Sequence, residues 1–269
     1  MSGGAAAEVP DVLRRIVAAR RARYAEVPAR ALPERERPLS PDENPFLAAL
    51  SHPSSDARVI AEVKMGSPRL GSLAGRVDPL RQAETYAEVG AAALSVVVEP
   101  DSFDGSYALL AACRAASGLP AIAKDFVVHP RQLEEAREAG ADAVLLIAAL
   151  YPADELAAWA RRARGLGLVP LVETHDEADV AKLAGGGWEL VGVNHRDLRT
   201  FDVDLARGEA LLPRLPAGAI KVAESGIASG ADVARLSRAG FDAFLVGESL
   251  LLASEPAALL GELLTRGGA

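Results

Sequence analysis

Two ionisable side chains interrupt a short apolar segment of this chain. Residues 58–71 read R-V-I-A-E-V-K-M-G-S-P-R-L-G, with Glu62 and Lys64 two positions apart. Residues i and i+2 of a β-strand point to the same face, so both side chains would lie on one side of the strand. Burying such a pair is costly unless the charges are paired or used. The pair is therefore a candidate for acid–base chemistry or for binding an anion.

The elements that would position this pair form a repeat. From residue 59 onward, β-favouring runs alternate with helical segments; the runs are V-I-A-E-V, A-L-S-V-V-V, A-I-A, A-V-L-L-I, V-P-L-V, L-V-G-V, I-K-V-A and A-F-L-V. Successive units begin roughly 20 to 35 residues apart, the scale of a βα repeat. Helices are predicted over residues 79–89, 130–139, 153–166 and 176–184. Eight units predict a single (β/α)8 TIM barrel over residues 58–269.

The chain before the barrel is predicted to form a helical extension over residues 1–57, and residues 1–269 are expected to be one domain. Apolar positions at helical spacing predict a helix over residues 12–27, with arginines such as Arg20 on a solvated basic face. The proline-rich residues 28–42 are predicted to be an extended connector. The pair Asn44-Pro45 then predicts a short capped helix.

Polar residues gather at the predicted carboxyl ends of the strands, where TIM barrels carry their active sites. They are Glu62 and Lys64, Glu99, Lys124 and Asp125, Glu173, Asn194 with Arg196 and Asp197, Glu224 and Ser225, and Gly247 and Glu248. A salt bridge at the barrel rim explains any one of them equally well. Because seven of eight strand ends are polar, an enzyme site is the favoured interpretation.

The last two strand ends indicate the class of ligand. E-S-G-I follows the seventh run and G-E-S-L follows the eighth, so small residues stand where backbone N–H groups can approach an anion. A short helix over residues 248–252 would add its N-terminus to the site. In TIM barrels these two positions often hold phosphate, so a phosphorylated ligand is predicted.

Composition excludes several other classes of protein. The net charge of −8 argues against a general nucleic-acid binder. No run is long and apolar enough to span a bilayer, and the opening residues lack a secretory signal, so a cytoplasmic protein without membrane partners is expected. The single cysteine, Cys113, is expected to be a buried structural thiol. A monomer or weak homo-oligomer is expected.

Taken in order, the motifs resemble the indole-3-glycerol phosphate synthase family. They are I-A-E-V-K-x-x-S-P-x-x-G, L-S-V-x-x-E-P-x-x-F-x-G-S, K-D-F, A-D-A-V-L-L-I, L-V-E-x-H, G-V-N-x-R-D-L-x-T-F and A-E-S-G-I. The resemblance implies a ring-closing carboxy-lyase of tryptophan biosynthesis. Its substrate would be 1-(2-carboxyphenylamino)-1-deoxyribulose 5-phosphate and its product indole-3-glycerol phosphate, with no metal or organic cofactor. It also implies that the N-terminal extension packs over the mouth of the barrel.

The resemblance assigns roles to individual residues. Lys124 would be the general acid and Glu173 the general base, with Glu62 assisting or holding hydroxyl groups. Lys64 would bind the substrate carboxylate or the phosphate, and these two alternatives stay open. The remaining expected site residues are Asn194 and Glu224 for orientation of the sugar, Ser225, Gly226, Gly247 and Glu248 for phosphate, Arg196 as a loop anchor, Ser67 in the first loop, and Phe103 and Phe126 for the anthranilate ring.

The chain also departs from the family pattern. The family more often has arginine where this chain has Ala123, so a cation is expected to be missing from the rim. Altered loop mobility and weaker carboxylate binding are expected from differences in the first loop, at Met65, Gly66, Arg69 and Leu70. His195 is expected to be a polar loop residue.

Two other functions remain as alternatives. An isomerase of the neighbouring step would share the phosphate loops but would need a different set of acids and bases. A paralogue that binds a phosphosugar without turnover, or that takes an altered substrate, is favoured only by Ala123.

Overall fold

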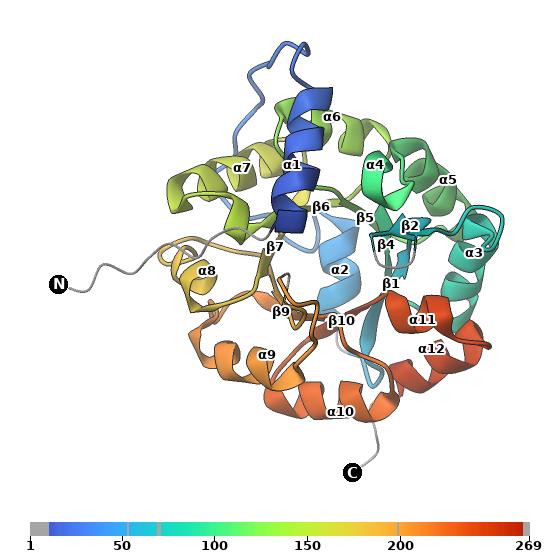
Figure 1. Cartoon of the computed structure of the whole chain (residues 1–269). Coiled ribbons are helices and arrows are strands. Elements are labelled where there is room, and N and C mark those ends of the chain that lie inside the picture. The colour runs from blue at the N-terminus through green and yellow to red at the C-terminus, as the bar shows by residue number, and fades with distance from the viewer. Residues whose placement is uncertain (1–10, 53, 69–70, 198, 266–269) are drawn as a thin grey trace.

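The computed structural model describes residues 11–52, 54–68, 71–197 and 199–265. Within these ranges, eight parallel strands close into a barrel in the order β1-β10-β9-β8-β7-β6-β5-β4, with helices around it (Figure 1). The strands are β1 (Arg58–Val63), β4 (Ala93–Val97), β5 (Ala121–Lys124), β6 (Ala143–Ile147), β7 (Val169–Thr174), β8 (Leu190–Asn194), β9 (Ile220–Glu224) and β10 (Ala243–Val246). The predicted (β/α)8 barrel is confirmed.

Alternation along the strands separates the barrel interior from the layer under the helices. In β1, Val59, Ala61 and Val63 pack in the layer between sheet and helices. Ile60 belongs instead to the cluster inside the barrel. Because side chains alternate with a period of two, Glu62 continues the inner row, at the carboxyl end of the strand. The predicted common face of Glu62 and Lys64 is therefore the inside of the barrel.

The outer helices begin and end largely where the sequence predicts. They are α3 (Pro79–Val89), α4 (Pro100–Phe103), α5 (Tyr107–Ser117), α6 (Pro130–Glu138), α7 (Ala153–Gly165), α8 (Glu177–Ala181), α9 (Leu205–Leu211), α10 (Gly230–Ala239), α11 (Glu248–Leu252) and α12 (Pro256–Leu264), with 3₁₀ turns η1 (Ala148–Leu150) and η2 (Leu212–Arg214). The helix predicted over residues 176–184 is too long, because the N–H groups of Lys182 and Leu183 bond carbonyls three residues back and continue α8 only as turns.

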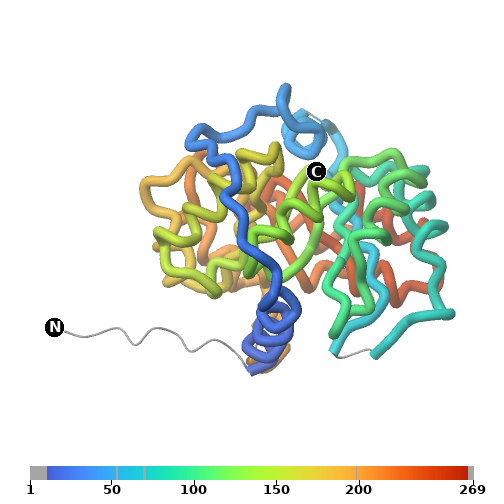
Figure 2. Tube along the Cα trace, turned by 90° about the horizontal axis from the view of Figure 1, so that it is seen from above, coloured from blue at the N-terminus to red at the C-terminus, as the bar shows by residue number. Residues whose placement is uncertain are grey.

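The N-terminal extension reaches both ends of the barrel. Helix α1 (Asp11–Arg23) lies at the mouth, and α2 (Pro45–Ser51) lies at the opposite end (Figure 2). Helix α2 starts as predicted: the side chain of Asn44 accepts hydrogen bonds from the N–H groups of Phe46 and Leu47. Its apolar side chains join the interior cluster of the barrel, so α2 closes the floor. The expected position over the mouth therefore holds for α1 only.

A buried ion pair attaches α1 to the barrel. Arg20 forms a salt bridge with Asp125, and the two side chains are 1% and 2% exposed. Tyr107 and Gln132 also donate hydrogen bonds to this carboxylate, at 2.9 and 2.8 Å. The prediction that Arg20 lies on a solvated face is wrong, because a partner distant in sequence compensates its burial.

No helix within the described ranges is long and apolar enough to cross a bilayer. The first loop of the barrel forms a small antiparallel hairpin from β2 (Gly66–Ser67) and β3 (Gly71–Ser72). Arg69 and Leu70, at which the sequence departs from the family, lie outside the described residues.

Candidate active site

A cavity of about 670 Å³ opens at the carboxyl ends of the strands. Its lining contains every predicted catalytic or binding residue except Glu224; these are Glu62, Lys64, Ser67, Phe103, Lys124, Phe126, Glu173, Asn194, Arg196, Ser225, Gly226, Gly247 and Glu248. Glu224 lies directly beneath, 1% exposed and in contact with Lys124. Val12, Leu13 and Ile16 of α1 complete the wall. The structure thus brings the predicted set together.

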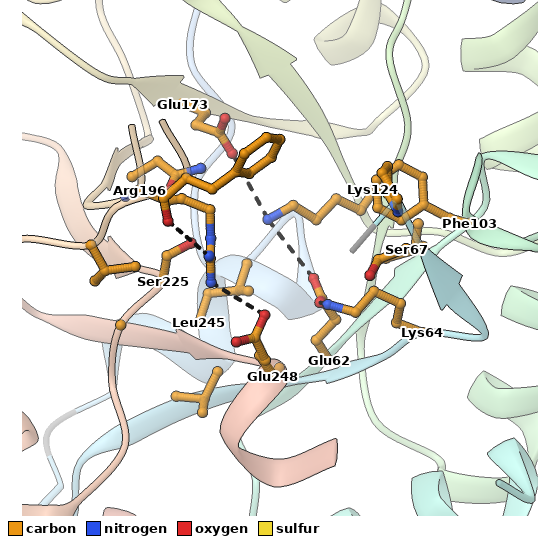
Figure 3. A pocket seen from close by; sticks show the side chains of 18 of the residues that line it. Glu62, Lys64, Ser67, Phe103, Lys124, Glu173, Arg196, Ser225, Leu245 and Glu248 are labelled. Atoms are coloured by element: carbon orange, nitrogen blue, oxygen red, sulfur yellow. Dashed lines mark hydrogen bonds and ion pairs between the residues drawn. The ribbon is translucent and has the colours of Figure 1, made fainter. Parts of the chain in front are cut away.

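Lys124 occupies the centre of the site (Figure 3). Its Nζ lies 2.9 Å from Oε2 of Glu224, 3.8 Å from Oε2 of Glu173 and 3.9 Å from Oε2 of Glu62. Burial alone would lower the pKa of Lys124, but the three carboxylates outweigh it and hold the pKa above its ordinary value. Lys124 is therefore an ammonium with a proton to donate.

Glu62 and Lys64 pair with each other on the wall formed by β1. Lys64 Nζ lies 3.0 Å from Oε1 of Glu62, and Ser95 donates a hydrogen bond of 3.5 Å to Oε2. Burial would raise the pKa of Glu62, but Lys64 and Lys124 lower it. Gly247 permits this arrangement, since a Cβ there would collide with Oε1 of Glu62. Glu62 is thus ionised, and Lys64 lines the cavity beside it.

Glu173 and Glu224 have pKa values shifted in opposite directions. Burial would raise the pKa of Glu173, but His175 and Lys124 lower it to about 2. Burial raises the pKa of Glu224 to about 7, with Lys124 opposing and Glu173 adding to the shift. Gly192 leaves room for Glu224, because a Cβ there would collide with Oε1. One carboxylate is thus fully ionised near neutral pH while the other titrates there.

The turn after β9 lines one side of the cavity with Ser225 and Gly226. Ser225 and Gly226 both have positive φ, 65° and 78°. Nearby, Arg196 Nη2 lies 3.3 Å from Oε2 of Glu248, the first residue of α11. The predicted short helix is confirmed. Small residues, a cation and the start of α11 at this side suit an anionic group of a ligand.

Two phenylalanines line the opposite side of the cavity. The rings of Phe103 and Phe126 lie 6.1 Å apart at 31°. In Figure 3, Phe103 and Ser67 lie on one side of Lys124, and Ser225 and Glu248 on the other. The site therefore has an apolar end suited to a flat ring, a charged centre and an end suited to an anion.

Three strand-end residues have other roles. The carboxylate of Glu99 caps α4, accepting hydrogen bonds from the N–H groups of Asp101 and Ser102. Asp125 holds α1. His195 is fully buried, and its Nδ1 lies 2.8 Å from the carbonyl oxygen of Glu224. His195 lies in the loop after β8, as expected, but its ring is buried and fills the space beside Gly208, where a Cβ would collide with it.

His175 lies 3.2 Å from Oε1 of Glu173 and is not among the site residues predicted from the sequence. The pattern that singled out Glu62 and Lys64 applies here too, since His175 follows Glu173 by two positions at a strand end. Among the described residues, no group of three or more His, Cys, Asp or Glu side chains is placed to hold a metal ion.

Comparison with known proteins decides the family. A family model described as indole-3-glycerol phosphate synthase matches residues 13–263. The chain belongs to the indole-3-glycerol phosphate synthase family. It is 43% identical over 227 residues to indole-3-glycerol phosphate synthase of Parafrankia sp. (strain EAN1pec), covering 84% of each chain. It is 41% identical over 245 residues to indole-3-glycerol phosphate synthase 1 of Streptomyces coelicolor, covering 88% of this chain and 91% of the relative.

A third relative carries the same description. The chain is 42% identical over 221 residues to indole-3-glycerol phosphate synthase of Mycobacterium tuberculosis (strain CDC 1551 / Oshkosh), covering 82% of this chain and 80% of the relative. Membership of the family makes this protein a carboxy-lyase of tryptophan biosynthesis.

The structure shows where two of the residues that depart from the family pattern, Ala123 and Gly66, lie. Ala123 packs in the layer between sheet and helices, on the face of β5 opposite to Lys124. A side chain at this position therefore starts behind the cavity wall, and the loss of a cation from the rim stays a prediction. Gly66 lies close to the segment after β4, and a Cβ there would stand 3.2 Å from Oδ2 of Asp104. This glycine allows the first loop to approach that segment closely.

Proposed function

We propose that this synthase converts 1-(2-carboxyphenylamino)-1-deoxyribulose 5-phosphate into indole-3-glycerol phosphate, carbon dioxide and water. The observation that carries the proposal is the ammonium of Lys124, surrounded by three carboxylates between an apolar end and an anion-binding end of one cavity. The substrate has the matching order of parts, with an aromatic ring, a carbonyl carbon and a phosphate.

Lys124 acts as the general acid in ring closure. The ring carbon that bears the carboxylate attacks the C2 carbonyl carbon of the ribulose chain, a carbon–carbon bond forms, and the carbonyl oxygen takes a proton from Nζ. Carbon dioxide then leaves, and the electron pair of the broken bond restores the aromatic ring. A buried ammonium suits this step, because the oxygen becomes a strong base as the bond forms.

Glu173 acts as the general base in dehydration. The new hydroxyl group leaves as water with a proton that solvent supplies, and the nitrogen becomes cationic through the ring. A proton of the neighbouring CH2 group, C1 of the former ribulose chain, then passes to Glu173, which forms the carbon–carbon double bond of the indole while the N–H group is retained. Although a carboxylate with a pKa of about 2 is a weak base, it suffices here because the cationic nitrogen makes the neighbouring C–H group acidic. Glu62 is placed to hold or assist the leaving hydroxyl group from the neighbouring wall.

The remaining residues bind and orient the substrate. Lys64 provides a cation for an anion of the substrate, and Asn194 and Glu224 orient the sugar chain. The phosphate lies against the anion-binding end, at the N–H groups of Ser225, Gly226, Gly247 and Glu248, with Arg196 anchoring the adjacent loop. Phe103 and Phe126 hold the anthranilate ring, and Ser67 lies beside them.

Turnover of the named substrate tests the proposal. Purified protein is incubated with the carboxyphenylamino-deoxyribulose phosphate, and formation of indole-3-glycerol phosphate is followed by indole fluorescence. We expect stoichiometric release of carbon dioxide with the product. If the substrate binds in a calorimeter but no product forms at high enzyme concentration, the protein is a non-catalytic paralogue and the proposal fails.

A further inference from the structure

His175 lies between two buried carboxylates at the edge of the proposed site. Its Nε2 is 3.2 Å from Oε1 of Glu173, and its Nδ1 is 3.5 Å from Oδ2 of Asp179. The side chain of His175 is 11% exposed, and those of Glu173 and Asp179 are 4% and 6% exposed. Both ring nitrogens are buried without a well-aligned hydrogen bond, so their contacts with the carboxylates are charge contacts.

This arrangement determines the protonation state of the ring. A neutral imidazole has one N–H group and one lone pair, so either tautomer would direct a lone pair at a carboxylate. Only the imidazolium presents an N–H group to both. Accordingly, Asp179 and Glu173 outweigh burial and raise the pKa of His175 to about 10.

A second cation, Lys182, holds Asp179 on the side away from His175. Lys182 Nζ lies 3.1 Å from Oδ1 of Asp179 and donates a hydrogen bond of 2.7 Å to the carbonyl oxygen of Ala148. Asp179 also accepts a hydrogen bond from the backbone N–H of His175, at 3.2 Å. The carboxylate that faces the ring is therefore held from both sides, and it cannot turn away without losing three contacts.

We propose that His175 is a positioning residue of the synthase, whose imidazolium, held by Asp179, keeps Glu173 ionised and directs its second oxygen toward Lys124. The proposal rests on the proposed function of Glu173 as general base. Its consequence is that one oxygen of Glu173 is occupied by His175, while the other faces the cavity beside Lys124.

The charges around Glu173 predict the effect of losing His175. Glu173 faces Lys124 from β5, Glu224 from β9 and Glu62 from β1, in addition to His175. Without the imidazolium, burial and the two other glutamates raise the pKa of Glu173, opposed by Lys124 and by the side chain of Asn194. Glu173 then accepts a proton as the pH falls through a range in which the wild-type residue stays ionised.

Nuclear magnetic resonance of the intact protein measures the protonation state of His175 directly. The measurement does not depend on the activity of any variant. With ¹⁵N-labelled histidine, the signals of His175 are those lost in His175→Asn. We expect both ring nitrogens of His175 to carry protons at pH 8, and Asp179→Asn to move the titration of the ring to lower pH. A neutral ring at pH 8 would overturn the proposal.

The pH dependence of kcat/KM tests the positioning role. We expect the ratio of wild-type to His175→Asn activity to grow by about tenfold or more between pH 8 and pH 5, as Glu173 gains a proton in the variant only. The same substitution at exposed His52 should leave the ratio constant. A constant ratio for His175→Asn would mean that the residue acts on folding alone, and the proposal would be wrong.

The two proposals fail in different ways. If the wild-type protein does not turn over the substrate, the proposed function fails, whereas a fully active Glu173→Gln overturns only the role of Glu173 as general base and the positioning role that depends on it. In either case the resonance experiment still reports the protonation state of His175. If turnover depends on Glu173 but His175 is neutral, only the positioning proposal is overturned.

Discussion

Glu173 and Glu224 are two glutamates of the same cavity with different environments. Glu173 faces two cations, Lys124 and His175, whereas Glu224 is buried beside Lys124 with one oxygen that has no partner among the described residues. The same side-chain type is therefore fully ionised at one position and titrates near neutral pH at the other. The two carboxylates therefore differ in protonation state although only β8 separates their strands, β7 and β9.

Loss of either proposed acid–base residue should lower turnover without preventing folding. We expect Lys124→Met and Glu173→Gln each to reduce kcat by at least about 100-fold, the usual scale for a general acid or base. Lys221→Met is the matched control, since Lys221 lies on the outer face of a barrel strand and does not line the cavity. Steady-state kinetics provide the measurement, and wild-type turnover in either site variant would contradict the role assigned to it.

Glu224 should make activity depend on pH near neutrality. Because its pKa is raised to about 7, the carboxyl group is increasingly protonated below that pH and loses the charge that holds Lys124 at 2.9 Å. We therefore expect kcat/KM to fall on the acid side with a midpoint near 7, and Glu224→Gln to abolish this step. Titration of the substrate phosphate is common to both proteins, so an identical midpoint in the variant would assign the step to another group.

The sequence could predict which side chains share a face of one strand. It could not predict which residues of different elements contact each other. The common face of Glu62 and Lys64 follows from the period of a β-strand, and the structure confirms it. Glu173 and His175 have the same spacing, yet the role of the histidine depends on Asp179, which lies on the following helix. The burial of His195 depends on Gly208 in the same way.

At the scale of elements, α1 is attached to the segment that carries Lys124. Arg20 of α1 binds Asp125, the residue directly after Lys124, and the same helix lines the cavity with Val12, Leu13 and Ile16. The helix was predictable from its apolar periodicity. Its position was not, because the pair that fixes it joins residues 105 positions apart. Local patterns carry no information on such a contact.

Breaking this pair should destabilise the protein and weaken substrate binding. Arg20→Met retains the apolar stem but leaves Asp125 buried without its cation, at a cost of about 3–5 kcal/mol in the free energy of unfolding. We also expect KM to rise, because α1 forms part of the cavity wall. Urea unfolding and steady-state kinetics measure the two effects.

The same helix offers a matched control for this substitution. Arg23 forms an exposed ion pair with Asp101, at 3.3 Å. Such surface pairs contribute about 0–1 kcal/mol, so Arg23→Met should change stability little. If Arg20→Met and Arg23→Met lowered the free energy of unfolding equally, the loss would come from a general sensitivity of α1 to substitution. The buried pair would then not be its cause.

At the scale of the whole molecule, the two ends of the barrel differ in character. The mouth gathers ionisable side chains around one cavity, whereas the floor is closed by apolar residues of α2 packed on the interior cluster. The eight-strand barrel was predictable because each βα unit repeats one pattern. The placement of α2 at the floor was not predictable, because the sequence of a short capped helix does not indicate which surface the helix packs against. The extent of the single domain, residues 1–269, stays a prediction.

This division predicts that stability and activity can be changed separately. Phe46 of α2 is completely buried in the floor cluster, so Phe46→Ala should lower the free energy of unfolding by about 3–5 kcal/mol while kcat and KM stay close to wild type below the unfolding transition. Phe103→Ala, the same substitution at a partly exposed ring of the mouth, should instead raise KM with a smaller loss of stability. Thermal unfolding and steady-state kinetics on both variants give the comparison. A large loss of kcat in folded Phe46→Ala would mean that packing at the floor is transmitted through the barrel to Lys124, and that the two ends are not independent.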